Sequence, residues 1–318
     1  MRKEEWIEKR LCELLPTPYY HVVFTLPHEF NQLIMANRKT IFAMLFAAAA
    51  ETLNKHSLNP EFLGAQTGIT MVLHTWGQNL SFHPHVHCIV TGGGISNGKW
   101  VEAKRKNSKF LFPEPSLMKM YKGIFLKMLR GAKIGLRENK NLPELIERAG
   151  RKKWNVYAKA PFGGPAQVVE YLGRYTHKIA ITNHRIVKID EHRVYFKYKD
   201  YRQQGKTREM SLSHGEFLAR FEQHILPRGF VKIRHYGFLQ NRNKLTRIAE
   251  IRASLNLEEA KPPVKLPVAV RMLEKFGRDI FKCPKCETGR LVLIKTTRPH
   301  TDVRIKADLK NKASPGVY

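Results

Sequence analysis

The sequence predicts an α+β fold: a central antiparallel sheet with helices packed on it, a mainly helical insertion and a basic C-terminal extension. Two strand-like runs, 68–75 and 83–90, flank a polar turn and predict a hairpin. A third strand-like run, 21–26, leads through Pro27 into a long helical pattern over 31–54. Antiparallel strands interleaved with helices are typical of a sheet that carries a helical layer.

Four segments follow one another along the chain. Residues 1–96 and 151–245 are expected to form the two parts of one domain, and the second part includes a helix over 165–179. Residues 97–150 predict a basic, mainly helical insertion, and residues 246–318 a basic, partly flexible tail. The pattern also predicts a strand over 154–160, a hairpin over 186–199 and a helix over 214–225.

Charge is the most unusual property of the composition. The 318 residues include 56 Lys and Arg but only 27 Asp and Glu, which gives a formal net charge of +29. Such an excess of Lys and Arg, with aromatic residues between them, predicts a polyanionic partner. The phosphates of a nucleic acid can lie along a basic groove while its bases stack on aromatic rings. A basic protein with solvated faces, or a component of a ribonucleoprotein, is the alternative.

The apolar and cysteine patterns exclude several classes of protein. The first residues alternate charged and apolar side chains, so no signal peptide is predicted, and the most apolar run, 41–50, is too short to span a bilayer. Four cysteines in this length do not form a disulfide framework. We therefore expect an intracellular protein with no membrane partner and no small-molecule cofactor.

His85 and His87 are two residues apart in a predicted strand, so their side chains share one face while Val86 points to the other. Two imidazoles placed in this way can bracket one metal ion. About 0.6 such pairs arise by chance from 14 His, so a run of packing or surface histidines is the alternative. His74 becomes a third ligand if the turn brings it opposite His85 or His87, and we prefer it to His83.

Tyr171 and Tyr175 are four residues apart in a predicted helix and therefore lie one turn above the other. Arg174 and Lys178 share this polar face and can hold a phosphate beside the two hydroxyls. About 0.4 such pairs are expected by chance from 11 Tyr, and a half-buried aromatic ridge is the alternative. Because a phenol with a pKa of about 10 is a poor nucleophile at neutral pH, it needs a cation such as the histidines can hold.

Four stretches that follow one another between Tyr19 and Lys244 resemble one protein family: YYHVVFTLPHEFN, VLHTWGQNLSFHPHVHCIVTGGGIS, VVEYLGRYTHKIAI and RGFVKIRHYGFLQNRNK. The family is that of the rolling-circle transposases of the insertion-sequence family numbered ninety-one, which belong to the HUH endonuclease superfamily. The resemblance implies an HUH-endonuclease-like sheet, Mg²⁺ or Mn²⁺ as cofactor, and cleavage of single-stranded DNA through a 5′-phosphotyrosine with a free 3′-hydroxyl.

Within that resemblance, His85 and His87 match the family's histidine motif, and Tyr171 and Tyr175 match its two tyrosines. The implied partners are single-stranded DNA at transposon ends and at the target, together with host replication proteins, in the nucleoid of the bacterial cytoplasm. A replication initiator or relaxase with the same chemistry is one alternative. A non-catalytic module that binds single-stranded nucleic acid is another.

Two cysteine patterns concern zinc. Members of the family usually carry a cysteine-rich zinc module before the matching region, and Met1 falls just after the place where that module would end, so we expect the chain to lack it. Near the other end, Cys283 and Cys286 have the spacing of half a zinc ribbon, but only His300 follows as a further candidate. Because two ligands do not close a tetrahedral site, the sequence disfavours a structural Zn²⁺ there.

Overall fold

The computed structural model describes the chain over most of its length. The described residues are 2–103, 111–132, 134, 141–159, 167, 169–170, 173, 180–259, 266–286 and 288–295, with residues 2–4 and 202 described by their backbone alone. Two compact units form, Met1–Pro263 and Val264–Tyr318.

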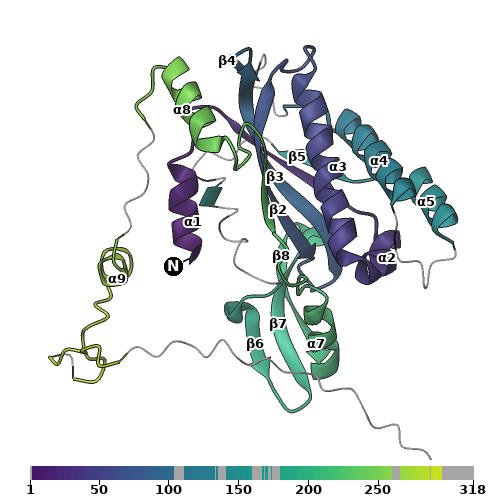
Figure 1. Cartoon of the computed structure of the whole chain (residues 1–318). Coiled ribbons are helices and arrows are strands. Elements are labelled where there is room, and N and C mark those ends of the chain that lie inside the picture. Colours follow the sequence, from purple (N-terminus) through teal and green to yellow (C-terminus); the bar gives the residue numbers. More distant parts are fainter. Residues whose placement is uncertain are drawn as a thin grey trace, which may run out of the picture. The chain divides into compact units, whose positions relative to one another are not determined.

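A six-stranded antiparallel sheet lies at the centre of the first unit (Figure 1). Its spatial order is β5-β1-β3-β2-β9, and β4 pairs with the end of β3. The strands are β1 (Tyr19–Thr25), β2 (Gln66–Trp76), β3 (Phe82–Ser96), β4 (Lys99–Glu102), β5 (Val156–Lys159) and β9 (Ile233–Gly237). The predicted α+β class with a central antiparallel sheet is confirmed.

Helices cover one face of this sheet (Figure 1). The long helix α3 packs on β2 and β3, and α4 packs beside α3 with α5 next to it. These helices are α2 (Asn31–Ala36), α3 (Arg38–Leu58), α4 (Glu114–Gly131) and α5 (Leu142–Arg151). The main hydrophobic core lies between the helices and the sheet, where Phe24, Met71 and Val86 of the strands meet Phe42 and Leu45 of α3.

The helical pattern over 31–54 is interrupted, contrary to the continuous helix that the sequence predicts. Asn37 separates α2 from α3 because its backbone, at φ −133° and ψ 38°, is not helical. Its side-chain amide donates to the carbonyl of Leu33, which compensates the end of α2. α3 itself is buried on most sides, as its apolar, alanine-rich sequence requires.

β3 is longer than the strand-like run 83–90 and continues into the glycine-rich run GGGISNGK, where the sequence pattern predicts that regular structure breaks. The strand reaches Ser96 and turns through Asn97 and Gly98, whose φ angles of 49° and 72° suit the tight hairpin that leads into β4. Gly94 shows why glycines are needed here: a Cβ would lie 2.6 Å from the carbonyl oxygen of Gln66. The glycines therefore permit close strand pairing and do not end the strand.

A smaller antiparallel sheet with the order β6-β7-β8 is part of the same unit. Its elements are β6 (Ile186–Ile189), β7 (Arg193–Asp200), β8 (Lys206–Ser213) and the following helix α7 (His214–Glu222). Leu80, from the turn between β2 and β3, is completely buried with Phe196 and Leu212 of this sheet. The predicted hairpin over 186–199 is confirmed, whereas β8 and β9 are strands that the sequence pattern did not reveal.

Three further helices lie within the described residues. α1 (Arg2–Leu11) and α8 (Lys244–Ser254) belong to the first unit, and α9 (Val268–Phe276) belongs to the second. None of the helices in the described part of the chain is both long and apolar enough to cross a membrane.

Candidate metal centre

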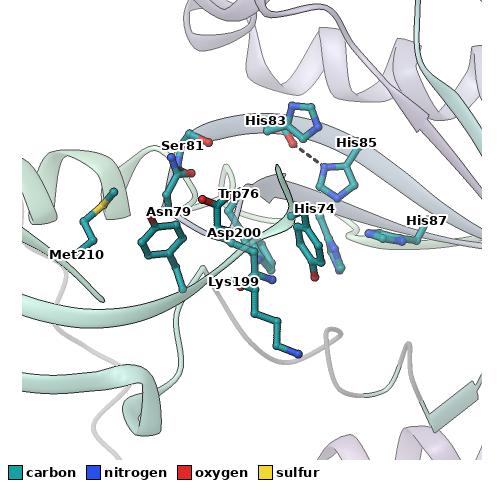
Figure 2. A pocket seen from close by; sticks show the side chains of 14 residues that line it. His74, Trp76, Asn79, Ser81, His83, His85, His87, Lys199, Asp200 and Met210 are labelled. Carbon is teal, nitrogen blue, oxygen red and sulfur yellow. Dashed lines mark hydrogen bonds between the residues drawn. The ribbon is translucent and has the colours of Figure 1, made fainter. Parts of the chain in front are cut away.

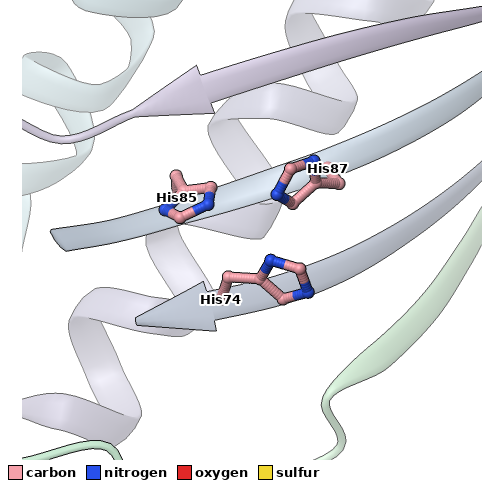
Figure 3. A group of neighbouring side chains, drawn as sticks. All are labelled: His74, His85 and His87. Carbon is pink, nitrogen blue, oxygen red and sulfur yellow. The ribbon is translucent and has the colours of Figure 1, made fainter. Parts of the chain in front are cut away.

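Three histidines gather on the face of the sheet that α3 and α4 leave uncovered. His74 of β2 pairs directly with His85 of β3, which is the register that a third ligand requires, and His87 lies two residues further along β3. One ring nitrogen from each of the three lies within 4.8 Å of the others. Among the described residues this is the one group of three or more His, Cys, Asp or Glu that can hold a metal ion (Figure 3).

The orientation of His85 is set by the backbone. Its Nδ1 lies 2.6 Å from the carbonyl oxygen of His83 (Figure 2). A carbonyl accepts only, so Nδ1 carries the proton and Nε2 keeps the lone pair that a metal needs. His83 thus contributes its carbonyl, while its exposed side chain stays outside the triad.

The orientation of His87 is set by another histidine. The Nε2 atom of His21, on β1, is hydrogen-bonded to Nδ1 of His87 at 2.8 Å, and the two rings stack with centroids 5.0 Å apart. His21 pairs with Ile89, so it reaches His87 diagonally across the two strands. This contact leaves Nε2 of His87 to face the triad.

His74 is held by an aromatic neighbour. Its ring stacks on Trp76 with centroids 4.8 Å apart and an interplanar angle of 20°. The ammonium group of Lys232 lies 5.0 Å from the centroid of the Trp76 ring, and burial lowers the pKa of this lysine to about 8. A cation therefore stands beside the histidines and attracts anions to this edge of the sheet.

Burial keeps the histidine cluster neutral at pH 7. It lowers the pKa of His85 to about 4 and, with a smaller contribution from Lys159, that of His21 to about 4. Burial also holds the pKa values of His74 and His87 well below that of a free imidazole. Neutral imidazole is the form that coordinates metals, so the cluster is ready to bind one without first losing protons.

The triad opens into a cavity of about 700 Å³ (Figure 2). One wall consists of the three histidines, Trp76 and the β2–β3 turn, and the other of residues from the small sheet, namely Tyr198, Lys199, Asp200, Tyr201 and Met210. Arg185 and Arg220 connect the walls by donating to the carbonyls of Gln78 and Asn79 in the turn. The cavity is large enough for a nucleotide-sized group and is lined by aromatic and polar side chains.

The predicted nucleophiles Tyr171 and Tyr175, and the predicted phosphate-binding residues Arg174 and Lys178, lie outside the described residues. Gly173, between the two tyrosines in the sequence, is described as helical and buried. A Cβ on it would overlap Cγ1 and Cδ1 of Ile7 in α1.

That helix, α1, lies on the histidine-bearing face of the sheet. Its Trp6 packs against Tyr19, Val72 and Ile89, and Val72 pairs directly with His87. Gly173 is therefore in contact with a helix that covers the same face as the triad.

Sequence reasoning did not find three residues that shape this site: His21, Trp76 and Lys232. His21 lies within the strand-like run YYHVVF, so its strand could be predicted. Only the pairing of β1 with β3 shows that its side chain reaches His87. Lys232 precedes β9, a strand hidden in a basic segment, and its place beside Trp76 follows from the pairing of β9 with β2.

Comparison with known proteins defines the class to which this site belongs. Residues 68–246, which include the three histidines, match the model of a family described as "Putative transposase". The chain is 39% identical over 310 residues to "Putative transposase y4qJ" of Sinorhizobium fredii (strain NBRC 101917 / NGR234), covering 92% of this chain and 77% of that protein. It is 30% identical over 295 residues to "Transposase for insertion sequence element IS801" of Pseudomonas savastanoi pv. phaseolicola, covering 89% and 69%.

These matches define a DNA-processing enzyme of insertion sequences, with DNA as its substrate. The chain belongs to this transposase family.

Replacing His21 tests its effect on the triad. We expect His21→Ala to weaken Mn²⁺ binding on the order of 10- to 100-fold, the usual effect of losing a hydrogen bond that orients a metal-binding histidine. Isothermal titration with Mn²⁺ measures this. His28→Ala is the control, because the side chain of His28 is 81% exposed. Equal affinities for wild type, His21→Ala and His28→Ala would refute the role given to His21.

The pH dependence of stability tests the burial of these histidines. An unfolded imidazole takes up its proton at a pH of about 6.5, whereas His21 and His85 have pKa values of about 4 in the fold. The unfolded state thus binds more protons between these values. The free energy of unfolding of the metal-free protein should therefore have its full value above pH ~6.5 and decrease as the pH falls toward ~4. For each such histidine the decrease is at most about 1.4 kcal/mol per pH unit.

Urea unfolding of EDTA-treated protein at successive pH values measures this decline. His85→Asn should make the decline shallower, and His28→Asn should leave it unchanged, since only the first removes a buried imidazole. A wild-type stability that stays constant from pH 7 to 4.5 would contradict the burial argument.

Proposed function

We propose that this transposase nicks and rejoins single-stranded DNA at element ends through a metal-assisted 5′-phosphotyrosine, as in rolling-circle transposition by HUH-type enzymes. The observation that carries the proposal is the neutral triad of His74, His85 and His87 on the face of the sheet opposite α3 and α4. Tyr171 and Tyr175 are the proposed nucleophiles, and Arg174 and Lys178 the proposed phosphate-binding residues.

The donor set supports a divalent transition metal in the triad. Three imidazole nitrogens suit Mn²⁺ better than Mg²⁺, because Mg²⁺ prefers oxygen ligands and releases its water reluctantly. We therefore propose Mn²⁺ as the better fit of the two ions that the family resemblance implies. When bound, the ion supplies positive charge that neutralises a non-bridging phosphate oxygen.

The chain's own residues supply the remaining chemistry. The phenolic oxygen of Tyr171 or Tyr175 forms a bond to the phosphorus, the bond from phosphorus to the 3′-oxygen breaks, and the proton lost by the tyrosine is balanced by one gained by the 3′-oxygen. The phosphodiester energy stays in the phosphotyrosine, so a later attack by a 3′-hydroxyl reverses the step and joins strands. A second tyrosine allows a second strand to be cleaved before the first is released.

The surroundings of the triad support a single strand as the substrate. A cavity with Trp76, Tyr198 and Tyr201 on its walls can accept an unstacked base beside the triad. Lys199 and Lys232 add positive charge at the same place. A stacked duplex does not offer free base faces to such rings, whereas a single strand does.

Contact between Gly173 and α1 further supports the proposal. α1 packs on the histidine-bearing face, and Gly173 lies two residues from each tyrosine in the sequence. A glycine at this contact lets the helical backbone at residue 173 approach α1 closely. A non-catalytic nucleic-acid module would need neither this approach nor the neutral triad.

Trapping the covalent adduct tests the proposed nucleophiles. Labelled single-stranded DNA with an element-end sequence is incubated with protein and Mn²⁺, and the adduct is counted on a denaturing gel. Tyr171→Phe and Tyr175→Phe should each leave some adduct and the double variant none, while Tyr195→Phe, on β7 but outside the cavity lining, keeps it. EDTA and His85→Ala should abolish it. Adduct in the double variant would place the nucleophile elsewhere.

The contact between Gly173 and Ile7 offers a rescue experiment. Gly173→Ala should lower adduct formation about 10- to 100-fold, because the new methyl overlaps Ile7 and displaces the segment. Ile7→Ala removes the two overlapping atoms, so the double variant should recover the rate of Ile7→Ala alone. Mn²⁺ affinity should be the same in all four proteins. A double variant as slow as Gly173→Ala would show that this contact does not position the segment.

A further inference from the structure

The second unit contains a tight loop around the sequence CPKC that the proposed function does not use. The N–H of Cys283 donates to the carbonyl of Gly289 at 2.8 Å, and the N–H of Gly289 donates to Sγ of Cys286 at 3.3 Å. Lys282 and Arg290 form an antiparallel bridge that closes the loop. Both cysteines are free thiols, and Cys286 is exposed.

Gly289 has a steric reason to be a glycine. A Cβ there would lie 3.0 Å from Sγ of Cys286 and 3.6 Å from Cβ of Cys283. Glycine therefore allows a backbone N–H to approach the sulfur without crowding it. An N–H that donates to sulfur favours the thiolate, which is the form that binds metals.

We propose that Cys283 and Cys286 are two thiolate ligands of a Zn²⁺ ion, at a site separate from the histidine triad. Two thiolates three residues apart in a loop closed by a β-bridge form half of a tetrahedral Zn²⁺ site. A redox-active pair with this spacing would instead lie at the start of a helix, and in the described residues that follow Cys286 no helix begins. The sequence alone disfavours a Zn²⁺ ion here, because it supplies only two ligands. The geometry of the closed loop favours the ion instead.

Two further donors complete the tetrahedron. In the part of the chain that the structure describes, no other His, Cys, Asp or Glu joins these cysteines in a group of three. We place the remaining two donors on the same two cysteines of a second copy, which gives half an ion per chain and four thiolates per ion.

Cobalt substitution of the full chain under reducing conditions tests the site. Co²⁺ bound to thiolates gives a charge-transfer absorption in the near ultraviolet that imidazole ligands do not give, so the histidine triad does not interfere. We expect this band in wild type, its loss on adding Zn²⁺, and its absence in Cys283→Ser and in Cys286→Ser. Cys12→Ser and His85→Ala are matched controls and should retain it.

Stoichiometry and mass test the contribution of the second copy: half an ion per chain and a doubling of mass with Zn²⁺ are expected, and one ion per monomeric chain would overturn the shared site. A second measurement needs no substitution: Zn²⁺ should slow alkylation of Cys283 and Cys286 by at least ~10-fold and leave Cys12 unchanged, as followed by peptide mass spectrometry. The proposal is overturned if wild type shows no thiolate band, if the band survives both serine variants, or if Zn²⁺ does not protect the two cysteines.

Discussion

The pairing register of β1, β3 and β2 is the constraint on which the candidate site depends. Side chains alternate between the two faces of a strand, so the register that buries Val86 and Met71 against the helices turns His87 and His74 to the other face. A slip of one residue would bury imidazoles in the main core and expose its apolar residues. Hydrophobic burial on one face therefore fixes the positions of the three histidines on the other with no added interaction.

The same register explains which parts of the molecule could be predicted from sequence. The hairpin that holds His85, His87 and His74 is local, and its strands alternate clearly, so its fold and face assignments could be predicted. β9 could not, because the run IRHYG is short and lies in a basic segment, and its place at the sheet edge is set by long-range pairing with β2. The contact of His21 with His87 also depends on long-range strand pairing, so the sequence alone did not reveal it. The helix predicted over 165–179 is described only at residues 167, 169–170 and 173, which are helical, and Tyr171 and Tyr175 lie outside the described residues.

Neutral ligands have an electrostatic consequence in a chain of net charge +29. Carboxylate ligands would cancel the charge of a bound divalent ion, whereas three neutral imidazoles leave its charge of +2 unchanged. The ion would then stand beside Lys232 as a concentrated positive centre, suited to phosphate and unfavourable for cationic competitors. No anionic ligand compensates the desolvation of the ion, and the orienting contacts of His85 and His87 offset part of that cost by fixing both rings in advance.

Leu80 is the buried apolar contact between the β2–β3 turn and the small sheet, beside the hydrogen bonds that Arg185 and Arg220 donate to that turn. It adopts a φ of 63°, unusual for a branched side chain, and its complete burial among Phe196 and Leu212 compensates the strain. The turn that carries Leu80 also connects the two histidine-bearing strands, so the small sheet packs on the same hairpin that presents the histidines. A displacement of that sheet would therefore change the width of the cavity and the ends of the histidine-bearing strands together.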